Sequence, residues 1–556
     1  MSGSFHALRK AMASQPQLPI WMMHIWQRMN EHKKLGLILG AGVTVDAGCP
    51  AWSDLVRALG KKTKSAVPFL KAASRSKFSE AYLAQILFQS HRRRSKRGAH
   101  ALPKKYWGYY FDSTWMDMVH RELYRNVGTK SFSSILFRHR YLEHLAKLCV
   151  RCGFVINFNF DGLVDEAAIR EIEKQPIKIL PEIIYRPKLE TRRGACIIYH
   201  INGYLPRERS RPRSDFLTFT EDAFADVLLL ADHASSEFVE ARFTTTTFLL
   251  LGTSLSDNSL KNMLRASMKK NSAHHHYIVY WEDAKSPRSA AERKQIFEVN
   301  LEVYNLISIF LTTDGIAELI EILNTNEARD FETAISDICP KIVDFRRRYY
   351  LVGAVSAGKS TILHALRSFT TFEEWLGMVP VEMYRDHNKL RRRQRLMVDK
   401  WLYGQLREKN EKMRNANLGI YVMDRAYFDL FAFSKTDAEN LRKTSELRQH
   451  STPSGDKFTQ GHIIFLEADK DAFEERRAKR GRVRSGKFEY SAATLVKQSG
   501  SLKKIYQAIP SHVFDTGKTS QEITARQIAR LILLGEYQPF DFEGRLDEVT
   551  SAGGKL

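Results

Sequence analysis

Short apolar runs recur along the first half of the chain, and each is followed by a turn or by polar residues. These runs lie at residues 37–39, 153–156, 196–200, 248–251 and 277–281. Apolar residues with helical spacing lie at 54–59, 80–89, 260–268 and 315–323, and an earlier helix is expected at 20–29. Buried strands that alternate with helices are typical of an open parallel sheet. The pattern therefore predicts an α/β fold with a Rossmann-like parallel sheet.

The same alternation begins again after a polar, charged stretch at residues 326–347. Strands are expected at 349–352, 378–381, 421–424, 462–466 and 513–515, and a closing helix at 521–534. A chain of 556 residues is longer than one hydrophobic core usually supports. We therefore predict a leader helix within 1–34, a first domain at 35–325, a linker at 326–347, a second α/β domain at 348–535 and a tail at 536–556. The tail beyond residue 541 is expected to be disordered.

The formal net charge of +23 favours anionic partners such as nucleotides or nucleic acid. No stretch of about 18 uninterrupted apolar residues occurs, so no membrane partner is expected. Five scattered cysteines, without a recognisable secretory signal, indicate the cytoplasm. Cys149 and Cys152 form a single C-x-x-C pair, too little for a structural zinc site. The basic run at 91–97 and the histidines at 274–276 are expected in solvated loops.

Gly40, Gly42 and Gly48 follow the first apolar run and precede a helix. Glycines at the exit of a strand allow backbone N–H groups to approach a pyrophosphate closely, and the following helix adds the positive end of its dipole. Tight strand-to-helix turns also use glycine for purely steric reasons. On this segment alone, a phosphate-binding turn and a merely compact turn both remain open.

Polar residues end the later strands of the first domain. Asn159 and Asp161 follow one apolar run, and His200 and Asn202 follow the next. Open α/β sheets bind ligands at the carboxyl ends of their strands. Asn and Asp also serve simply as turn formers and helix caps. These four residues are candidate site residues, as is the small-residue loop after the next strand, which contains Gly252, Thr253 and Ser254.

Taken in order, these segments resemble the sirtuin-like family, in particular its zinc-free bacterial branch that hydrolyses NAD⁺ in defence against phage. The resemblance covers about residues 35–325. It rests on Gly40-Ala41-Gly42, Gly48-Cys49-Pro50-Ala51-Trp52, Asn159-Phe160-Asp161 and Gly252-Thr253-Ser254. The resemblance implies that the cofactor NAD⁺ is bound by Gly40, Ala41, Gly42, Pro50, Trp52, Gly252, Thr253 and Ser254.

The chemistry that the family implies is cleavage of the nicotinamide–ribose bond through an oxocarbenium-like state, with a histidine as general base. The resemblance assigns Asn159 as the catalytic amide and Asp161 as the acid that orients the ribose. The family's histidine normally precedes the glycine, where this sequence has Asn202, and an amide cannot accept the proton. His200 lies two residues earlier on the same strand and could face the same pocket. It could equally be an ordinary strand histidine, in which case the domain binds NAD⁺ or a derivative without cleaving it.

The second domain opens with Gly353-Ala-Val-Ser-Ala-Gly358-Lys359-Ser360, between an expected strand and a helix that starts at Thr361. This is the G-x-x-x-x-G-K-S pattern of a phosphate-binding loop in its strand–loop–helix setting. The loop amides can cradle phosphates, Lys359 can reach the β and γ oxygens, and Ser360 can bind Mg²⁺. ATP, or another nucleoside triphosphate, is therefore expected here with Mg²⁺, in contact with Gly353, Gly358, Lys359, Ser360 and Thr361.

Later segments resemble the thymidylate kinase and deoxynucleoside kinase group over about residues 348–535. Asp424 and Arg425 end an apolar strand, as in that group. Arg476 and Arg480 belong to an arginine-rich segment suited to closing over transferred phosphate, because guanidinium groups grip phosphate oxygens in pairs. The segment could also be a basic, solvent-facing helix. Glu382 follows the expected strand at 378–381, where that group often has an acid near the phosphate acceptor.

Three functions remain open from the sequence. The first is an antiphage effector whose sirtuin-like domain hydrolyses NAD⁺, while its kinase-like domain binds or phosphorylates a nucleotide as a sensor or regulator. The second is a nucleotide or deoxynucleotide kinase whose sirtuin-like domain only binds a nucleotide or mediates assembly, for example into a homo-oligomer. The third, a nucleic-acid binder, is not favoured, because aromatic residues are not interleaved along a basic groove.

Overall fold

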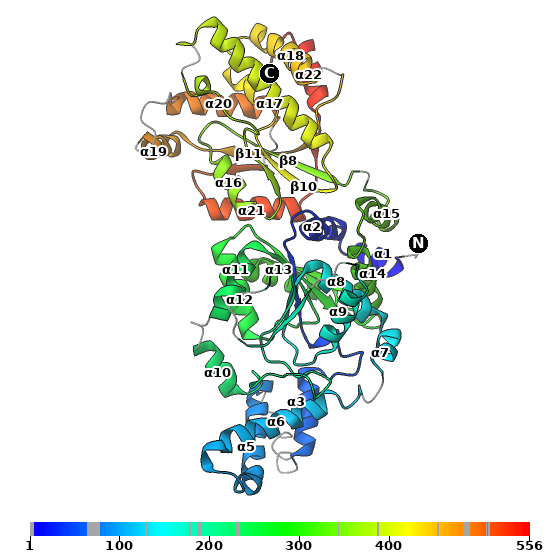
Figure 1. Ribbon diagram of the computed structural model, residues 1–556. Helices are drawn as coiled ribbons and strands as arrows, with labels where there is room; N and C mark the ends of the chain where they lie inside the picture. Colours follow the sequence, from blue (N-terminus) through cyan, green and yellow to red (C-terminus); the bar gives the residue numbers. More distant parts are fainter. Residues whose placement is uncertain are drawn as a thin grey trace. The chain divides into compact units, whose positions relative to one another are not determined.

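The computed structural model describes residues 5–63, 78–127, 131–176, 180–186, 192, 194–229, 234–342, 344–385, 389–452, 455–481, 490–507, 509 and 512–556. The chain divides into two compact units (Figure 1). The first comprises Met1–Leu18, Arg28–Ser267 and His275–Ile338, and the second comprises Pro19–Gln27, Met268–His274 and Cys339–Leu556. Each unit has its own largely parallel sheet with helices on both faces, so the predicted α/β class is confirmed.

The first unit is built on a seven-stranded sheet in the order β3-β4-β2-β1-β5-β6-β7, with every pairing parallel. Its strands are β1 (Leu35–Leu39), β2 (Phe154–Asn157), β3 (Pro181–Ile184), β4 (Cys196–His200), β5 (Thr247–Leu251), β6 (His276–Trp281) and β7 (Leu306–Leu311). Every residue of β1, β2, β4, β5 and β7 is buried. Strands covered on both faces need apolar side chains throughout, which explains their continuous apolar runs in the sequence.

Helices cover both faces of the first sheet. The helices and 3₁₀ turns up to residue 338 are α1 (His6–Met12), α2 (Leu18–Asn30), η1 (Ala41–Val43), α3 (Trp52–Lys62), α5 (Glu80–Ala99), η3 (Lys104–Tyr106), α6 (Trp107–Leu123), α7 (Phe132–Arg138), α8 (Arg140–Cys152), α9 (Leu163–Glu173), α10 (Glu221–Leu229), α11 (Ala234–Thr245), α12 (Asn258–Lys270), α13 (Ala290–Tyr304), α14 (Thr313–Leu323) and α15 (Ala328–Ile338). In Figure 1, α8, α9 and α14 lie on one side of this sheet and α11, α12 and α13 on the other. Phe243 of α11 and Leu260 of α12 pack with Ile38 and Leu250 in one buried cluster.

The second unit is built on a six-stranded sheet. Five strands are parallel in the order β12-β11-β8-β10-β9, and β13 pairs antiparallel with β11. The strands are β8 (Arg346–Val352), β9 (Thr370–Phe372), β10 (Gly419–Asp424), β11 (Gly461–Glu467), β12 (Val513–Asp515) and β13 (Pro539–Phe540). The helices and 3₁₀ turns are α16 (Lys359–Ala365), η4 (Val381–Tyr384), α17 (Arg392–Arg414), η6 (Asp429–Phe433), α18 (Asp437–Ser451), α19 (Lys470–Gly481), α20 (Ala492–Ile505), α21 (Gln521–Leu534) and α22 (Phe542–Ser551).

In Figure 1, α17, α18, α20 and α22 cover one face of the second sheet, and α16 and α21 cover the other. Residues Pro19–Gln27, within the expected leader helix, belong to this unit. The Trp21 indole N–H donates to the Leu533 carbonyl at 2.9 Å, and the Ile420 N–H donates to the Gln27 side-chain oxygen at 2.8 Å. This segment of α2 is therefore part of the second unit's packing rather than of a separate leader.

The prediction of a strand at residues 378–381 is wrong. The strand in this part of the chain is β9 at Thr370–Phe372, and residues 381–384 form the 3₁₀ turn η4. Pro380 precedes this turn and cannot donate to a strand ladder, which explains why the apolar residues there do not pair. The expected linker at 326–347 also has structure of its own, because it contains α15 and the start of β8.

The expectation of a disordered C-terminal tail is wrong as well. Residues Phe542–Ser551 form α22, and Phe542, Leu546 and Val549 are fully buried. Their spacing of four and three residues places them on one face of the helix. The helix was not predicted because the small and polar residues at the end of the chain indicated disorder.

Two segments expected in solvated loops lie elsewhere. The basic run at 91–97 belongs to helix α5, with its arginines exposed to solvent. His274, His275 and His276 are buried. The Phe248 N–H donates to His276 Nδ1 at 3.1 Å, and burial lowers the pKa of His276 to about 3, so this side chain is a neutral member of the core.

No helix within the described ranges is long and apolar enough to cross a membrane. Nor does any cluster of three or more His, Cys, Asp or Glu side chains among those residues have the arrangement to hold a metal ion.

Candidate functional site

The carboxyl edge of the first sheet has a topological switch point at β1. The strand lies between β2 and β5. The chain adds strands on one side of β1 up to β4 and then on the other side from β5 to β7, so the order of the strands reverses at β1. In open parallel sheets, ligands bind in the crevice outside the carboxyl ends of strands at such a point. The turn with Gly40 and Gly42 follows β1, the segment with Asn159 follows β2, and the loop with Gly252 follows β5.

Glycine is required at positions 40, 42 and 252 because two loops pack backbone to backbone. The N–H groups of Gly40 and Gly42 donate to the carbonyls of Leu251 and Gly252, each at 2.9 Å. A Cβ on Gly40 would lie 2.5 Å from the Gly252 oxygen, and a Cβ on Gly252 would lie 2.6 Å from the Val43 nitrogen. Steric packing thus accounts for these glycines by itself. The neighbours are backbone atoms, apart from the Val43 side chain, which would lie 2.8 Å from a Cβ on Gly252, and Gly42 remains exposed to solvent.

Asn159 and Asp161 are joined to this turn by hydrogen bonds. Asn159 donates from its side-chain nitrogen to the Gly40 carbonyl at 3.0 Å. Asp161 accepts from the Thr44 hydroxyl at 2.9 Å and from the Leu163 N–H at 3.1 Å. Burial raises the pKa of Asp161 to about 6, although both hydrogen bonds favour the carboxylate. The structure therefore brings the predicted amide and acid together beside the glycine turn.

His200 is not directed toward a ligand. Its Nδ1 lies 3.0 Å from the Asn159 carbonyl, and its Nε2 lies 2.9 Å from Asp165 Oδ1 on α9. Both partners are acceptors, so each ring nitrogen donates and the imidazole pairs as a cation with the Asp165 carboxylate. Burial works to lower the pKa of His200, but the Asp165 carboxylate outweighs it and the pKa is raised. This corrects the expectation that His200 could serve as the general base, because neither nitrogen is available to take a proton.

Asn202 lies in the turn after β4 and is buried. Its side-chain nitrogen donates to the Phe158 carbonyl at 3.3 Å, and its amide also contacts the Asp257 carboxyl group. The loop between Gly252 and Asp257 contains Ser254, whose hydroxyl lies 3.0 Å from the Ser256 hydroxyl. The contact between Asn202 and Asp257 therefore joins the turn after β4 to the loop that follows β5.

Pro50 and Trp52 have a more structural role than the sequence suggests. Pro50 precedes α3, which begins at Trp52. The Trp52 ring stacks on Phe219 and Phe224 at centroid distances of 5.8 and 5.7 Å. Its buried indole N–H nevertheless has no hydrogen-bond partner in the described part of the chain. An unpaired buried donor is costly, and this indole N–H is a donor that a bound ligand could satisfy.

The phosphate-loop motif adopts a strand–loop–helix arrangement at the switch point of the second sheet. β8 lies between β10 and β11, and the loop runs from Gly353 to Gly358 into α16. Gly358 has a φ of 98°, and a Cβ on Gly353 would lie 2.3 Å from the Leu466 oxygen. Ser356 has a φ of 70°, which is strained for a residue other than glycine. Thr361 follows in the first turn of α16 and is exposed.

Lys359 and Ser360 contact the edges of this loop. The Lys359 ammonium group donates to the carbonyls of Gly353 and Ala354 at 2.8 and 2.9 Å. Burial, and then the nearby Arg425 cation, lower the pKa of Lys359. The Ser360 hydroxyl donates to Asp424 Oδ2 at 2.9 Å, while Asp424 Oδ1 is buried without a hydrogen-bond partner in the ranges described. A hydroxyl and a carboxylate with a spare oxygen are hard ligands of the kind that Mg²⁺ prefers.

Arg425 is held by two carboxylates, neither of which was predicted from the sequence as a site residue. Its Nε donates to Glu374 at 2.6 Å, and its Nη1 donates to Asp429 at 3.2 Å. Burial works to raise the pKa of Glu374, but the cations of Arg425, Lys359 and Lys409 lower it overall. Arg425 has a φ of 68°, so this arrangement is kept at a backbone cost.

The acid predicted beside the phosphate acceptor was Glu382, which lies in η4 and is half-buried. Glu374 comes two residues after β9, and β9 has only three residues. A strand of that length has no detectable apolar pattern, so the sequence signal for Glu374 was weak. Lys409 was also missed; it is buried, donates to the Asp424 carbonyl at 2.9 Å, and has a pKa that burial lowers to about 8.

Arg476 on α19 contacts the loop between Gly353 and Gly358. Its guanidinium group donates to the carbonyl of Ser356 at 2.9 Å and to that of Thr516 at 2.6 Å. The Thr516 hydroxyl in turn donates to the Ala357 carbonyl at 2.9 Å. Arg480 belongs to the same helix, but its side chain lies outside the described residues.

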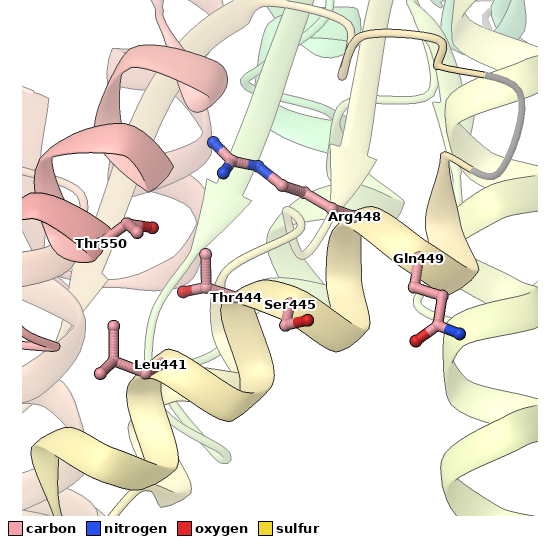
Figure 2. Close-up of a pocket in the computed structure, with 6 residues that line it drawn as sticks. All are labelled: Leu441, Thr444, Ser445, Arg448, Gln449 and Thr550. Carbon is pink, nitrogen blue, oxygen red and sulfur yellow. The ribbon is translucent and has the colours of Figure 1, made fainter.

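Two other hollows lie away from these residues. A groove of about 580 Å³ runs between α18 and α22, and Figure 2 shows its lining side chains, Leu441, Thr444, Ser445, Arg448, Gln449 and Thr550. Arg448 pairs with Asp547, and no phosphate-loop residue lines this groove. A smaller cavity of about 240 Å³ in the first unit is lined in part by Val43, Asp46 and Ala47, on the turn that follows β1.

Comparison with protein families gives one match in this region. A family model described as a SIR2-like domain matches residues 153–304, about a quarter of the chain. The matched range contains Asn159, Asp161, Asn202 and the loop after β5, but not the turn at Gly40. No curated protein matches the chain. The sirtuin-like part of the sequence resemblance is therefore supported over the segment from β2 to α13.

Proposed function

We propose that the first unit binds NAD⁺ at the carboxyl edge of its sheet and hydrolyses the nicotinamide–ribose bond. The observation that carries this proposal is the hydrogen bond from the Asn159 side chain to the Gly40 carbonyl. It joins the candidate catalytic amide to the glycine turn at the switch point, where α/β sheets bind dinucleotides. The SIR2-like match over residues 153–304 supports the same reading.

In this proposal the residues of the first unit have distinct roles. Ala41, in the turn after β1, and the loop from Gly252 to Ser254 bind the phosphates through backbone amides, while the N–H groups of Gly40 and Gly42 hold the two loops together. Asn159 and Asp161 orient the ribose and the attacking water. Cleavage releases neutral nicotinamide and leaves ADP-ribose, and the proton of the attacking water is passed to a base and then to solvent.

We further propose that the second unit binds a nucleoside triphosphate at the loop from Gly353 to Gly358. Lys359 would exchange its contacts with the loop carbonyls for the β and γ phosphates, which is consistent with its lowered pKa. Ser360 and Asp424 would hold Mg²⁺, which neutralises phosphate charge. Arg476 contacts both the loop and Thr516, so it is suited to closing over the bound phosphates.

The two sites together suggest an antiphage effector in the cytoplasm. An NAD⁺ hydrolase that is always active would deplete the NAD⁺ of its host cell. A nucleotide site that controls the hydrolase would prevent this loss. Such gating requires that the nucleotide bind the active state more tightly than the inactive one. The test is to incubate the purified chain with NAD⁺ and each nucleoside triphosphate or deoxynucleotide, and to measure nicotinamide release.

A nucleotide or deoxynucleotide kinase is the second candidate. The observation that favours it is the engagement of His200 with Asp165 and Asn159, which leaves the first unit without its expected base. In that case the first unit binds a nucleotide or mediates assembly. Phosphate transfer that is abolished by Lys359→Ala, with NAD⁺ left intact under every condition, would select this function.

A further inference from the structure

Asp257 ends the loop that follows β5 and caps helix α12. Its Oδ1 accepts the N–H of Leu260 at 3.0 Å. Its Oδ2 is buried, yet it has no hydrogen-bond partner among the residues that the structure describes. Leaving a buried carboxylate oxygen unpaired is costly, so an oxygen of this kind needs an explanation.

The surroundings of Asp257 supply that reason. The side chain of Asn202 contacts its carboxyl group, and Asn202 stands where the resemblance places the proton-accepting histidine. Burial raises the pKa of Asp257, while the N–H groups of Leu260 and Ser259, the Asn202 amide and the Lys261 cation lower it; burial prevails. A carboxylate made more basic by burial therefore lies beside the position from which the family's base is missing.

The buried ionisable groups at the neighbouring strand ends are hydrogen-bonded or ion-paired, although Asp165 also has one oxygen, Oδ2, without a partner among the described residues. Both oxygens of Asp161 accept hydrogen bonds, from Thr44 and from Leu163. Both nitrogens of His200 are bonded, and the charge of Asp165 is compensated by His200. Asp257 is the carboxylate at this edge that has a spare oxygen and no compensating ion pair within the described ranges.

The backbone of the same loop is strained. Leu255, two residues before Asp257, is buried and has a φ of 56°. A left-handed conformation is unfavourable for a bulky residue, and such strain is concentrated at functional sites.

We propose that Asp257 is the general base of the first site, an assignment that rests on the proposed hydrolysis of NAD⁺. As the bond between C1′ and nicotinamide breaks, its electron pair leaves with nicotinamide. The water oxygen bonds to C1′, and the proton that the water loses passes to Asp257 Oδ2 and from there to solvent. In this arrangement Asn202 orients the carboxylate through its amide.

The test compares the full-length native chain with Asp257→Asn, which keeps an oxygen for the Leu260 N–H but removes the basic carboxylate. Nicotinamide release is expected to fall by about 100-fold or more, since general-base catalysis contributes about 10²–10⁴-fold. The affinity for NAD⁺, measured by calorimetry, is expected to stay unchanged. Asp283→Asn, which alters an exposed aspartate that bonds only its own turn, is the matched control and is expected to leave release unchanged.

Rescue separates a base from a helix cap. The double variant Asn202→His with Asp257→Asn is expected to recover release, with an acid limb in its pH profile near the imidazole pKa of about 6.5. A double variant that stays inactive would assign Asp257 to capping alone and overturn the inference. Unchanged release and pH profile in Asp257→Asn would overturn it too, while leaving the proposed hydrolysis intact. A native chain that releases no nicotinamide with any nucleotide would instead remove the hydrolysis, and this assignment with it.

Discussion

Asn159 donates its side-chain amide to the carbonyl oxygen of Gly40, 3.0 Å away, and so ties the segment after β2 to the turn after β1. The same segment is held from its other side, because the Asn159 carbonyl accepts a hydrogen bond from His200. The amide is thus fixed between two strand ends, and this rigidity is what a positioned catalytic group requires.

Replacement of Asn159 by Ala is expected to abolish this positioning. We predict a fall in nicotinamide release of at least about 100-fold, because misplacement of a reacting group by about 1 Å already costs that much. The measurement is nicotinamide released from NAD⁺ in the presence of the activating nucleotide. Asn262→Ala, on the exposed face of α12, is the control and should release nicotinamide at the native rate. Equal rates in both variants would remove Asn159 from the site.

His200 and Asp165 form a buried pair, so their role is stability rather than proton transfer. Removing one partner leaves an uncompensated buried charge, and His200→Gln is expected to lower the free energy of unfolding by about 3–5 kcal/mol. The folded-state pKa of His200 is raised, so its contribution is fully present below the unfolded value of about 6.5. The contribution is lost as the pH rises through the folded pKa. Urea titrations at several pH values should therefore show the native and variant stabilities converging at high pH; a constant difference would contradict the pairing.

Lys359 is predicted to bind the triphosphate. Lys359→Ala should weaken binding of ATP with Mg²⁺ by at least about 100-fold, because a cation bonded to phosphate in a dry site is worth several kcal/mol. Calorimetry gives the affinity directly. Lys400→Ala, which alters an exposed lysine on α17, is the matched control. If the two variants bind equally well, the loop at 353–358 is not the nucleotide site.

Glu374 rather than Glu382 is expected to serve the second site. Its carboxylate is 2.6 Å from Arg425 Nε, whereas Glu382 lies in the 3₁₀ turn η4. We predict that Glu374→Gln lowers any nucleotide-dependent activity by about 10²-fold or more and that Glu382→Gln has the smaller effect. Glu373→Gln, at an exposed neighbouring carboxylate, is the control. A larger loss in Glu382→Gln would restore the assignment made from the sequence.

The sequence was most informative where strands are buried on both faces. The strands β1, β2, β4, β5, β10 and β11 were predicted because a parallel sheet covered by helices demands continuous apolar runs. The phosphate-loop motif was placed correctly between a strand and a helix. Two short or interrupted strands were missed or misplaced, since β9 has three residues and β3 begins with an exposed proline. The strand β7 at Leu306–Leu311 was missed as well, although it is a largely apolar run that is buried throughout.

Within the candidate sites, the sequence pointed to some residues that the structure brings together, such as Asn159 and Gly40, but not to Glu374, to Lys409 or to the partners of His200. Asn159 and Asp161 could be predicted because they follow an apolar run directly. The engagement of His200 depends on Asp165, which lies on a helix, and no local pattern reveals such a pairing. The sequence around Asp257 indicates an ordinary helix cap. Only its contact with Asn202 and its unpaired Oδ2 distinguish Asp257 from other capping residues.

The most direct test of the account is nicotinamide release by the purified, full-length chain. NAD⁺ is supplied with Mg²⁺ and, in separate reactions, with each nucleoside triphosphate and deoxynucleotide, and products are separated by chromatography. Nicotinamide and ADP-ribose are expected in equal amounts under at least one condition, and Asn159→Ala is expected to release both at least about 100-fold more slowly. Intact NAD⁺ in every reaction, from a chain that still binds ATP through Lys359, would contradict this expectation.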